Sequence, residues 1–354
     1  MISPKISEIL QSAVMAPSSC NCQPWRFEVR GNIIKIFNMQ NRDESLFNYL
    51  QRASLLAHGA LIENAVICSR ASGFDPDVRL LPDRARPDLI AEIELLTGTR
   101  RIDPLYEFIP QRATNRSQYS AAPLSEKENN KLLNQAFWFP HLGFKIGCTD
   151  AQKKMISTVT GFNSSICLEN RELHRFLFNS IRWTKNSAEK TRDGLYINSL
   201  GLSFFEKLLL CAAKPWIIAK CMNRLGLSAM ASRKAAGLCI SSAAVCVITA
   251  PDDSALNFIE SGRLLQRVIL EAARTGLSTQ IIAGAALLIQ KVLSDDTSGL
   301  SNNQVSDLLE HDRHLRSAFD VSDDTIILCL RIGRSQTSAP GSLRIQPQKI
   351  TTTL

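Results

Sequence analysis

Two long apolar segments constrain the fold of this chain more than any other feature. Residues 53–71 and 256–276 both have the pattern of a buried helix that stops at a glycine, and an offset of 203 positions aligns them. The matched pairs are Gly59 with Gly262, Leu61 with Leu264, Ile62 with Leu265, Val66 with Ile269 and Gly73 with Gly276. Two unrelated buried helices can share this spacing, but the order helix, corner, strand, long helix, strand also occurs twice. The sequence therefore favours an internal duplication whose halves pack as the subunits of a dimer do.

The composition is that of an ordered globular protein with a cationic surface. A length of 354 residues suffices for two average domains or one large one, and 45% hydrophobic residues suffice for a large core. The formal net charge of +8 suits an anionic partner, such as nucleic acid, acidic lipid or a phosphorylated cofactor. The Lys and Arg residues form no long run and do not alternate with aromatic residues, so we expect no nucleic-acid partner.

The cysteine and histidine spacing gives no indication of a metal site. The ten cysteines include no CxxC pair, and the five histidines do not cluster with them. With no signal peptide apparent, we expect reduced thiols and a cytoplasmic location. The most apolar stretch, residues 202–222, contains four charged residues and is therefore not expected to cross a membrane. An amphipathic helix that packs inside the protein or touches a membrane surface fits it better.

The beginning of the chain predicts a helix, a corner and a hairpin. Ser3 is a suitable N-cap for a helix with Pro4 at its first position, and Pro17 disfavours helical geometry at Ala16. Two alternating runs follow, residues 25–30 and 33–38, joined by a Gly-Asn turn. Further strands are expected at residues 77–82, 90–96, 144–148, 237–250 and 323–333, and an irregular tail after them.

Two polar segments are candidates for binding chemistry. Around residues 112–116, an extended chain would place Arg112, Thr114 and Arg116 on one side, which suits a phosphate, although most Arg-rich loops are only solvated. In the corner, Asn21 and Gln23 could read the edge of a planar heterocycle or simply satisfy local backbone groups.

The two segments together resemble one family. Residues 16–27, APSSCNCQPWRF, resemble the A-P-S-x-x-N-x-Q-P-W-x-F motif of the nitroreductase-like FMN-dependent oxidoreductases. Residues 112–116, RATNR, are similar to its phosphate-binding R-x-S-x-R motif, with Thr in place of Ser. In ordinary members the Arg motif comes first and two subunits hold FMN between them. The inverted order here resembles the mycobacterial Acg-like branch, whose members look like a fused dimer.

The resemblance implies a fold and a domain organisation. The fold would be α+β, a nitroreductase-like α/β sandwich of mainly antiparallel sheets around long central helices, internally duplicated so that one chain mimics a dimer. Residues 1–105 would form the half with the corner motif. Residues 106–354 would form the half with the Arg motif, including a helical insert at about 150–235 that caps the pocket. A monomer is then expected to hold one FMN.

The resemblance also assigns roles to individual residues. Those expected to bind FMN are Arg112, Thr114 and Arg116 at the phosphate, Pro17, Ser18, Ser19, Asn21 and Gln23 at the ring edge, Thr275 and Gly276 with backbone N–H groups near flavin N5, and Arg334 or Arg344 as a further phosphate ligand. No side chain is expected to be catalytic, because the flavin supplies the chemistry. Cys20 and Cys22 beside a flavin could be redox-active, but buried cysteines usually only pack.

The function implied is that of an FMN-dependent oxidoreductase. FMN would take a hydride from NADH or NADPH and pass electrons to a small acceptor, such as a nitroaromatic or a quinone, in a ping-pong reaction. The alternative is an Acg-like protein that sequesters or senses FMN behind a lid, with little turnover.

Overall fold

The alternating residues of the first hairpin form strands that bury one face of a five-stranded sheet. In this computed structural model, which describes residues 2–354, the strand order is β11-β1-β2-β4-β3. Its strands are β1 (Trp25–Arg30), β2 (Ile33–Asn38), β3 (Phe74–Leu80), β4 (Leu89–Thr97) and β11 (Thr351–Thr353). β1 and β2 meet at a turn in which Gly31 has a φ of +59°, a conformation that favours glycine. All pairs in this sheet are antiparallel except β1 with β11.

A second sheet is antiparallel throughout and more deeply buried. Its order is β5-β8-β10-β9. The strands are β5 (Gly143–Gly147), β8 (Ala244–Ala250), β9 (Ser278–Ile282) and β10 (Thr325–Gly333). Every residue of β8 is buried, which explains its continuous apolar run where the first hairpin alternates. Two short parallel strands, β6 (Ile181–Arg182) and β7 (Leu195–Tyr196), lie outside both sheets.

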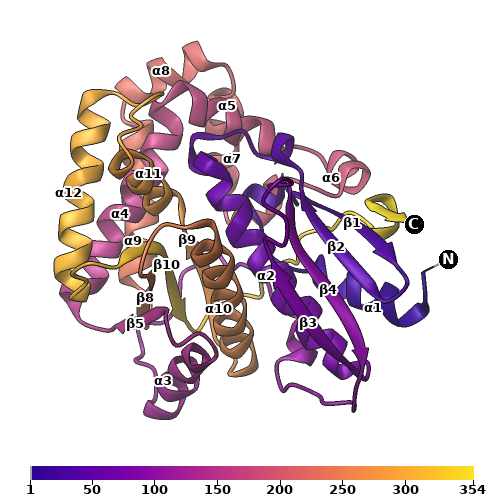
Figure 1. Cartoon of the computed structure of the whole chain (residues 1–354). Helices are drawn as coiled ribbons and strands as arrows, with labels where there is room; N and C mark the ends of the chain where they lie inside the picture. The colour runs from indigo at the N-terminus through magenta and orange to yellow at the C-terminus, as the bar shows by residue number, and fades with distance from the viewer. Residues whose placement is uncertain (1) are drawn as a thin grey trace.

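Two 20-residue helices, α2 and α10, lie side by side between the sheets (Figure 1). The helices of the chain are α1 (Pro4–Ala13), α2 (Arg52–Ala71), α3 (Glu126–Leu133), α4 (Asp150–Glu169), α5 (Arg171–Ser180), α6 (Lys185–Thr191), α7 (Phe204–Ala212), α8 (Trp216–Arg224), α9 (Leu227–Ile240), α10 (Ala255–Arg274), α11 (Gly284–Leu293) and α12 (Asn302–Phe319). Every residue of α2 except Arg70 is buried, as expected for a central helix.

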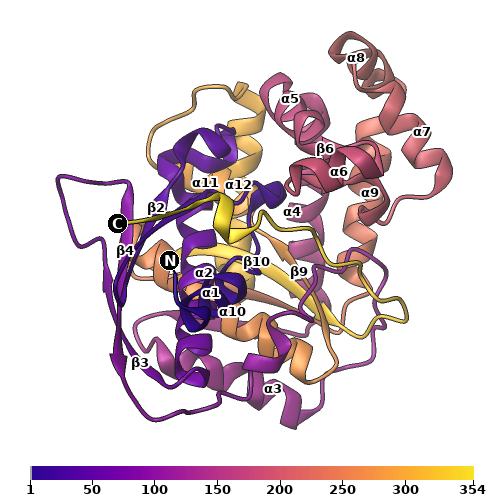
Figure 2. The ribbon, with the colours of Figure 1, turned by 90° about the vertical axis from the view of Figure 1, so that its right-hand side faces the viewer.

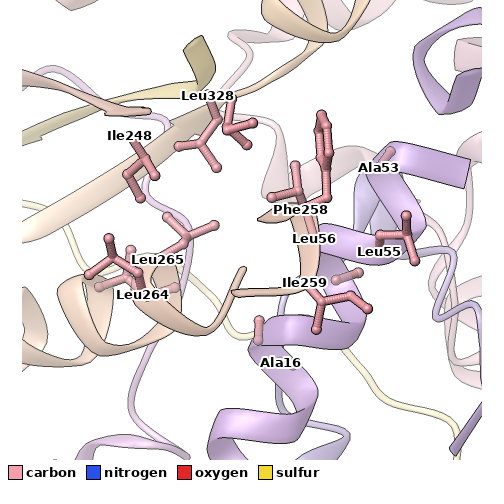
Figure 3. Close-up of a cluster of buried hydrophobic side chains, with 14 of the residues drawn as sticks. Ala16, Ala53, Leu55, Leu56, Ile248, Phe258, Ile259, Leu264, Leu265 and Leu328 are labelled. Atoms are coloured by element: carbon pink, nitrogen blue, oxygen red, sulfur yellow. The ribbon is translucent and has the colours of Figure 1, made fainter. Parts of the chain in front are cut away.

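The contact between α2 and α10 is reciprocal. A Cβ atom on Gly59 would overlap the carbonyl oxygen of Ile259, and a Cβ atom on Gly262 would overlap that of Leu56. The offset of 203 relates Gly59 to Gly262 and Leu56 to Ile259, so each helix presents the same pair of positions to the other. Figure 3 shows Leu56 and Ile259 close together at this crossing. The matched glycines are therefore required because the two backbones touch.

Buried polar contacts one turn further along repeat this reciprocity. Asn64 Oδ1 accepts a hydrogen bond from Gln266 Nε2 at 2.6 Å, and the Glu63 carboxylate pairs with Arg267 Nη1 at 2.9 Å. Under the same offset, Gln266 is the counterpart of Glu63, and Arg267 is the counterpart of Asn64. Glu63 therefore contacts the counterpart of Asn64, and Asn64 contacts the counterpart of Glu63.

The fold class expected from the sequence is confirmed: the chain is α+β, with mainly antiparallel sheets around long central helices. Two local expectations were wrong. Residues 237–240 end α9 instead of beginning a strand, because the buried run starts only at Ala244. The end of the tail is not irregular, because Thr351–Thr353 adds β11 to the sheet of the N-terminal hairpin (Figure 2). The last strand of the chain thus pairs with the first one.

The core also contains a histidine that should make stability depend on pH. His58 of α2 is buried, with Nδ1 2.7 Å from the Ser54 carbonyl oxygen, and burial lowers the pKa of His58 to about 4. Its pKa in the unfolded chain is near 6.5, so the unfolded state takes up the proton first as the pH falls. The free energy of unfolding should therefore decrease between pH 6.5 and 4, by about 1.4 kcal/mol per pH unit at most.

A variant isolates this contribution from those of other titrating groups. Denaturant unfolding of wild type and His58→Gln at several pH values should show a steeper loss of stability in the wild type over that window. Parallel pH dependences in the two proteins would show that His58 is not held neutral.

Candidate functional site

The corner after α1 is a strained turn held by its own side chains. Cys20, Asn21 and Gln23 have φ values of +44°, +56° and +52°, a region that non-glycine residues rarely adopt. Each such residue costs about 1 kcal/mol or more, so the surrounding contacts must hold the turn. One of these is Ser18 Oγ, which accepts a hydrogen bond from the Gln23 backbone N–H at 3.0 Å.

The two amide side chains of the corner have structural roles, which corrects their assignment to the ring edge. Asn21 Nδ2 donates to the carbonyls of Gly194 and Leu343, each at 3.1 Å. Gln23 Nε2 donates to the Arg192 carbonyl at 2.8 Å, and its Oε1 accepts from the Ile345 N–H at 2.8 Å. Both side chains are buried and tie the corner to the α6–β7 turn and to the C-terminal tail. Their hydrogen-bonding groups are used within the protein.

The Arg-rich loop is fixed against β9. Thr114 forms a bridge with Thr279, and the Asn115 N–H donates to the Thr279 carbonyl at 3.0 Å. The Asn115 side chain donates to the carbonyl of Thr337 at 2.8 Å. The loop is therefore held between the second sheet and the tail, and the direction of each of its side chains follows from that placement.

The corner and the Arg-rich loop line one cavity of about 310 Å³. Pro17, Ser18, Ser19, Thr114 and Arg116 all contribute, so the structure brings five of the predicted residues together. The other lining residues, mostly apolar, are Cys20, Phe47, Ala53, Leu56, Ala57, Asn163, Cys167, Phe176, Leu177, Leu265, Ile281, Ala283, Gly284, Leu287 and Leu328. Ala53, Leu56, Leu265 and Leu328 appear in Figure 3, so the cavity lies directly over the α2–α10 pair. We call this space the central cavity.

Two polar groups of the central cavity lack partners. Arg116 is its one charged lining residue, and within residues 2–354 the guanidinium has no hydrogen-bond or ion-pair partner. Burial lowers the pKa of Arg116, which marks the cost of holding this charge away from water. Asn163 Oδ1 on α4 is buried and, within the same described residues, accepts no hydrogen bond. The cavity thus offers an uncompensated cation and a free acceptor to a ligand.

Arg112 does not share the direction of Thr114 and Arg116, which corrects the extended-loop expectation. Its N–H donates to the Phe108 carbonyl in a turn, so strict alternation starts only after it. Arg112 lines a smaller cavity of about 210 Å³, together with Ala113, Asn115 and Ser278.

Arg112 is instead the neighbour of Arg344. Both donate to the Met15 carbonyl at 3.3 Å, two residues before Pro17 of the central cavity. Arg344 also donates to Asn21 Oδ1 at 2.9 Å and to the Val14 carbonyl at 2.8 Å, so each guanidinium nitrogen has an acceptor and its contribution to anion binding would be its charge. Burial lowers the pKa of Arg112 to about 10, and burial together with Arg112 lowers that of Arg344 to about 9. Neither has a carboxylate partner within residues 2–354, and Arg112 Nε is buried without a partner there.

Three other predicted residues lie elsewhere. Thr275 and Gly276 end α10: the Gly276 N–H donates to the Ala273 carbonyl, and a φ of +74° fits a helix-ending glycine. A Cβ atom on Gly276 would meet no atom within 4 Å among residues 2–354, so that side of the residue is open space. Arg334 is not part of the central cavity, because its guanidinium pairs with Glu128 at 2.6 Å near the surface.

The backbone that does reach the central cavity is the junction of β9 and α11. Ala283 and Gly284 line the cavity, and the first amides of α11, which begins at Gly284, have no carbonyl partners within the helix. A Cβ atom on Gly284 would overlap Asn163 Oδ1, so a larger residue at this position would require the Asn163 side chain to move. The small residues from Ala283 to Ala286 are the sequence signal for this junction, which was not predicted. The sequence carried no such signal for Asn163, Cys167 and Phe176, which come from distant helices.

The thiols of the corner are protonated. Burial, and then the charge of Asp43, raise the pKa of Cys20 to about 11 and also raise that of Cys22. Protonated thiols are poor nucleophiles, so the packing role is favoured over a redox role. Cys20 also separates the central cavity from a polar one.

This polar cavity has a volume of about 590 Å³ and shares Cys20 and Phe176 with the central cavity. It is lined by charged residues of both signs: Arg42, Glu44, Glu172, Arg175, Arg182 and Asp193. Phe176, on α5 of the helical insert, therefore stands where the two spaces adjoin.

Comparison with known proteins agrees with the corner motif. A family model described as a putative TM nitroreductase matches residues 1–54, the segment that contains Pro17, Ser18 and Ser19. The N-terminal segment is nitroreductase-like. Among curated proteins, none matches the chain.

Solved structures similar to this chain include several named as nitroreductases. The FMN-dependent nitroreductase NfnB from Mycobacterium smegmatis, in complex with NADPH, has 11% identity over 68% of this chain and 92% of its own, with a TM-score of 0.37. A nitroreductase with bound FMN from Desulfitobacterium hafniense has 10% identity over 71% of this chain and 99% of its own, with a TM-score of 0.39. An FMN-dependent nitroreductase from Clostridium difficile has 12% identity over 68% and 95%, with a TM-score of 0.37.

Two further observations concern the whole of the described chain. In the part that the structure describes, residues 2–354, no helix combines the length and the apolarity needed to cross a bilayer. Over the same residues, His, Cys, Asp and Glu side chains form no group of three with the geometry of a metal site.

Proposed function

We propose that the central cavity and the Arg112–Arg344 pair together bind FMN. The observation that carries this proposal is Arg116, a guanidinium without a partner in an otherwise uncharged and mostly apolar cavity, facing a space shared with Pro17 and Ser18. A flat heterocycle with carbonyl acceptors fits such a cavity, because its faces are apolar and its edge is polar. The free Asn163 Oδ1 suits an N–H group on that edge.

The phosphate is assigned to Arg112 and Arg344. Two neighbouring buried guanidiniums without a carboxylate are electrostatically unfavourable, and a dianionic group would compensate them. The unpartnered Arg112 Nε is a further donor for a phosphate oxygen. Thr114 lies in the loop between this pair and Arg116, so a molecule that is anionic at one end and planar at the other matches the order of these residues.

The bound flavin would supply hydride and electron transfer at its ring. The protein's own residues would bind and orient it. The amides at the start of α11, near Ala283 and Gly284, present positive partial charge to the cavity. Ser18, Ser19 and Thr114 add hydroxyl groups to the wall. Phe176 and Leu177 cover the cavity from α5 and would limit the entry of water.

We infer that the chain is an FMN-dependent oxidoreductase that takes reducing equivalents from NADH or NADPH and passes them to a small acceptor such as a nitroaromatic or a quinone. The polar cavity beside Cys20 would admit the donor, and its Arg175 would meet the donor's phosphates, since Arg42 and Arg182 already pair with Asp193. Anaerobic mixing of the flavin-loaded protein with NADH or NADPH should bleach the flavin absorption, and adding the acceptor should restore it. A loaded protein that neither donor bleaches would refute turnover.

The covering position of Phe176 favours a second candidate, a protein that holds FMN behind a lid with little turnover. Phe176 lines both cavities, so shortening it joins them. If α5 restricts access, Phe176→Ala should accelerate flavin reduction by NADH or NADPH about tenfold or more in stopped-flow measurements. Met222→Ala, in the same insert but away from the cavities, serves as the control. Equal rates in Phe176→Ala and wild type would contradict a lid at this residue.

The halves of the chain, residues 1–105 and 106–354, would then correspond to two fused subunits. The reciprocal contacts of Gly59 with Gly262 support this duplication. One half supplies the corner and the other the Arg-rich loop, so we propose a monomer with one flavin. A cytoplasmic location goes with this proposal, since NADH and NADPH are cytoplasmic reductants.

A further inference from the structure

Helices α7 and α8 expose an apolar surface that belongs to no cavity described above. In α7, which has no buried residue, Phe204 is 70% and Phe205 is 75% exposed. In and just after α8, Ile217 is 76% and Leu225 is 89% exposed. We call this the docking surface, and its residues are Phe204, Phe205, Leu208, Leu209, Ile217, Ile218 and Leu225. An exposed apolar group of this size on a globular protein indicates an interaction site.

The spacing of these residues gives each helix one apolar side. Phe204 and Leu208 lie one turn apart on α7, as do Phe205 and Leu209. The opposite side of the segment packs on the protein, where Ala213 and Ala219 are buried in a small cluster with Leu168 and Phe178. The docking surface is therefore a formed amphipathic structure.

The segment that carries the docking surface is rich in cations. Residues 201–240 contain six Lys and Arg residues and a single acidic residue, Glu206. That carboxylate is neutralised by Lys234 at 2.6 Å, and the pair also fixes α7 to α9. Lys214, Lys220 and Arg224 are exposed, and Lys220 and Arg224 lie one turn apart beside Ile217.

The position of the two helices leaves them accessible. In Figure 2, α7 and α8 form an outer corner of the molecule, well away from β3 and from both termini. Short helices with exposed Phe and Leu and flanking Lys and Arg are typical of segments that lie in the interface of an anionic bilayer. In residues 2–354 no helix is suited to crossing the bilayer, so the contact would be with its surface.

We propose that α7 and α8 dock this protein on the surface of an anionic lipid bilayer, with the docking surface among the acyl chains and Lys214, Lys220 and Arg224 at the headgroups. A second copy of the chain fits less well, because a two-fold interface would bring the same cations face to face. An acidic protein is the remaining candidate partner for the docking surface. The headgroup charge and the apolar interior of a bilayer match both parts of the surface at once.

Flotation of the full chain with lipid vesicles tests the proposal. We expect binding to vesicles of phosphatidylcholine and phosphatidylglycerol in equal parts, little binding to phosphatidylcholine alone, and weakening by salt. Phe204→Glu with Phe205→Glu should reduce the partition coefficient at least about tenfold, since two anchors are lost and repulsion is added. Lys220→Glu with Arg224→Glu should reduce it about twentyfold or more, since each cation near the surface contributes about fivefold.

Phe137→Glu is the matched control, since Phe137 is 80% exposed but follows α3, at the opposite end of the molecule from α8 in Figure 1. It should bind as wild type does. Circular dichroism shows whether each variant folds, and because every substituted side chain is exposed, all should. Absence of binding at low salt, or equal loss in the control, would overturn the proposal. So would self-association that the Phe204→Glu, Phe205→Glu variant abolishes without any vesicle binding.

Discussion

Gly59→Ala should destabilise the protein by about 3 kcal/mol or more, because the new methyl group must push α2 away from the backbone of α10. The overlapping atom is the Ile259 carbonyl oxygen, which cannot rotate aside as a flexible side chain would. Urea unfolding measures the effect. Gly237→Ala is the matched control: this glycine lies within α9, and its added Cβ atom would meet nothing within 4 Å. It should leave stability unchanged or raise it by up to about 1 kcal/mol.

The reciprocal glycine makes the prediction sharper. Gly262→Ala should cost as much as Gly59→Ala, since its methyl group would overlap the Leu56 carbonyl. The double variant should lose clearly less stability than the sum of the two, because one substitution already separates the helices. Additive losses, or single variants as stable as wild type, would mean that the backbones do not touch at these glycines.

Arg112→Ala combined with Arg116→Ala should abolish most FMN binding and leave the fold intact. Truncating one partner of a buried charged pair costs about 2–5 kcal/mol, so the dissociation constant for FMN should rise at least about a hundredfold. The fold should persist because, within residues 2–354, neither guanidinium has a carboxylate partner to leave unpaired. Removing Arg112 should even relieve repulsion of Arg344. Fluorescence titration with FMN measures the affinity, and thermal unfolding measures the fold.

Arg334→Ala provides the matched control for charge and residue type. Arg334 pairs with Glu128 near the surface and does not line the central cavity, so FMN affinity should not change. Arg116→Lys keeps the positive charge but loses the guanidinium geometry. Its affinity for FMN should lie between those of Arg116→Ala and wild type. Full retention of flavin in the Arg112→Ala, Arg116→Ala variant would reject the phosphate and ring assignments together.

The features predictable from the sequence were those set by local pattern. The alternation of residues 25–30 and 33–38 predicted the hairpin, and the matched glycines predicted the central helix pair. The corner and the Arg-rich loop were expected to meet, and Pro17, Ser18, Thr114 and Arg116 do line one cavity. Their meeting was implied by the family resemblance of the two motifs and not by local pattern, since contacts with Gly194, Leu343 and Thr279 hold the two segments in place.

The features that were missed depend on distant partners. Asn21 and Gln23 are polar residues in the right motif, but carbonyls at Arg192 and Gly194 engage them, and no local signal reveals such partners. Gly276 was assigned to the flavin by the family resemblance, but its place after an apolar helix and its positive φ are also what a C-cap requires. The contribution of β11 to the first sheet depends on where the tail returns, so a three-residue strand of threonines carried no pattern of its own.

The flavin content of the chain tests the central claim most directly. The protein is reconstituted with excess FMN, separated from free flavin by gel filtration, and its absorption in the flavin bands is compared with its protein concentration and molar mass. We predict one FMN per chain in a monomer, because one corner and one Arg-rich loop are brought to a single cavity. A colourless protein, or two flavins per chain, would contradict this.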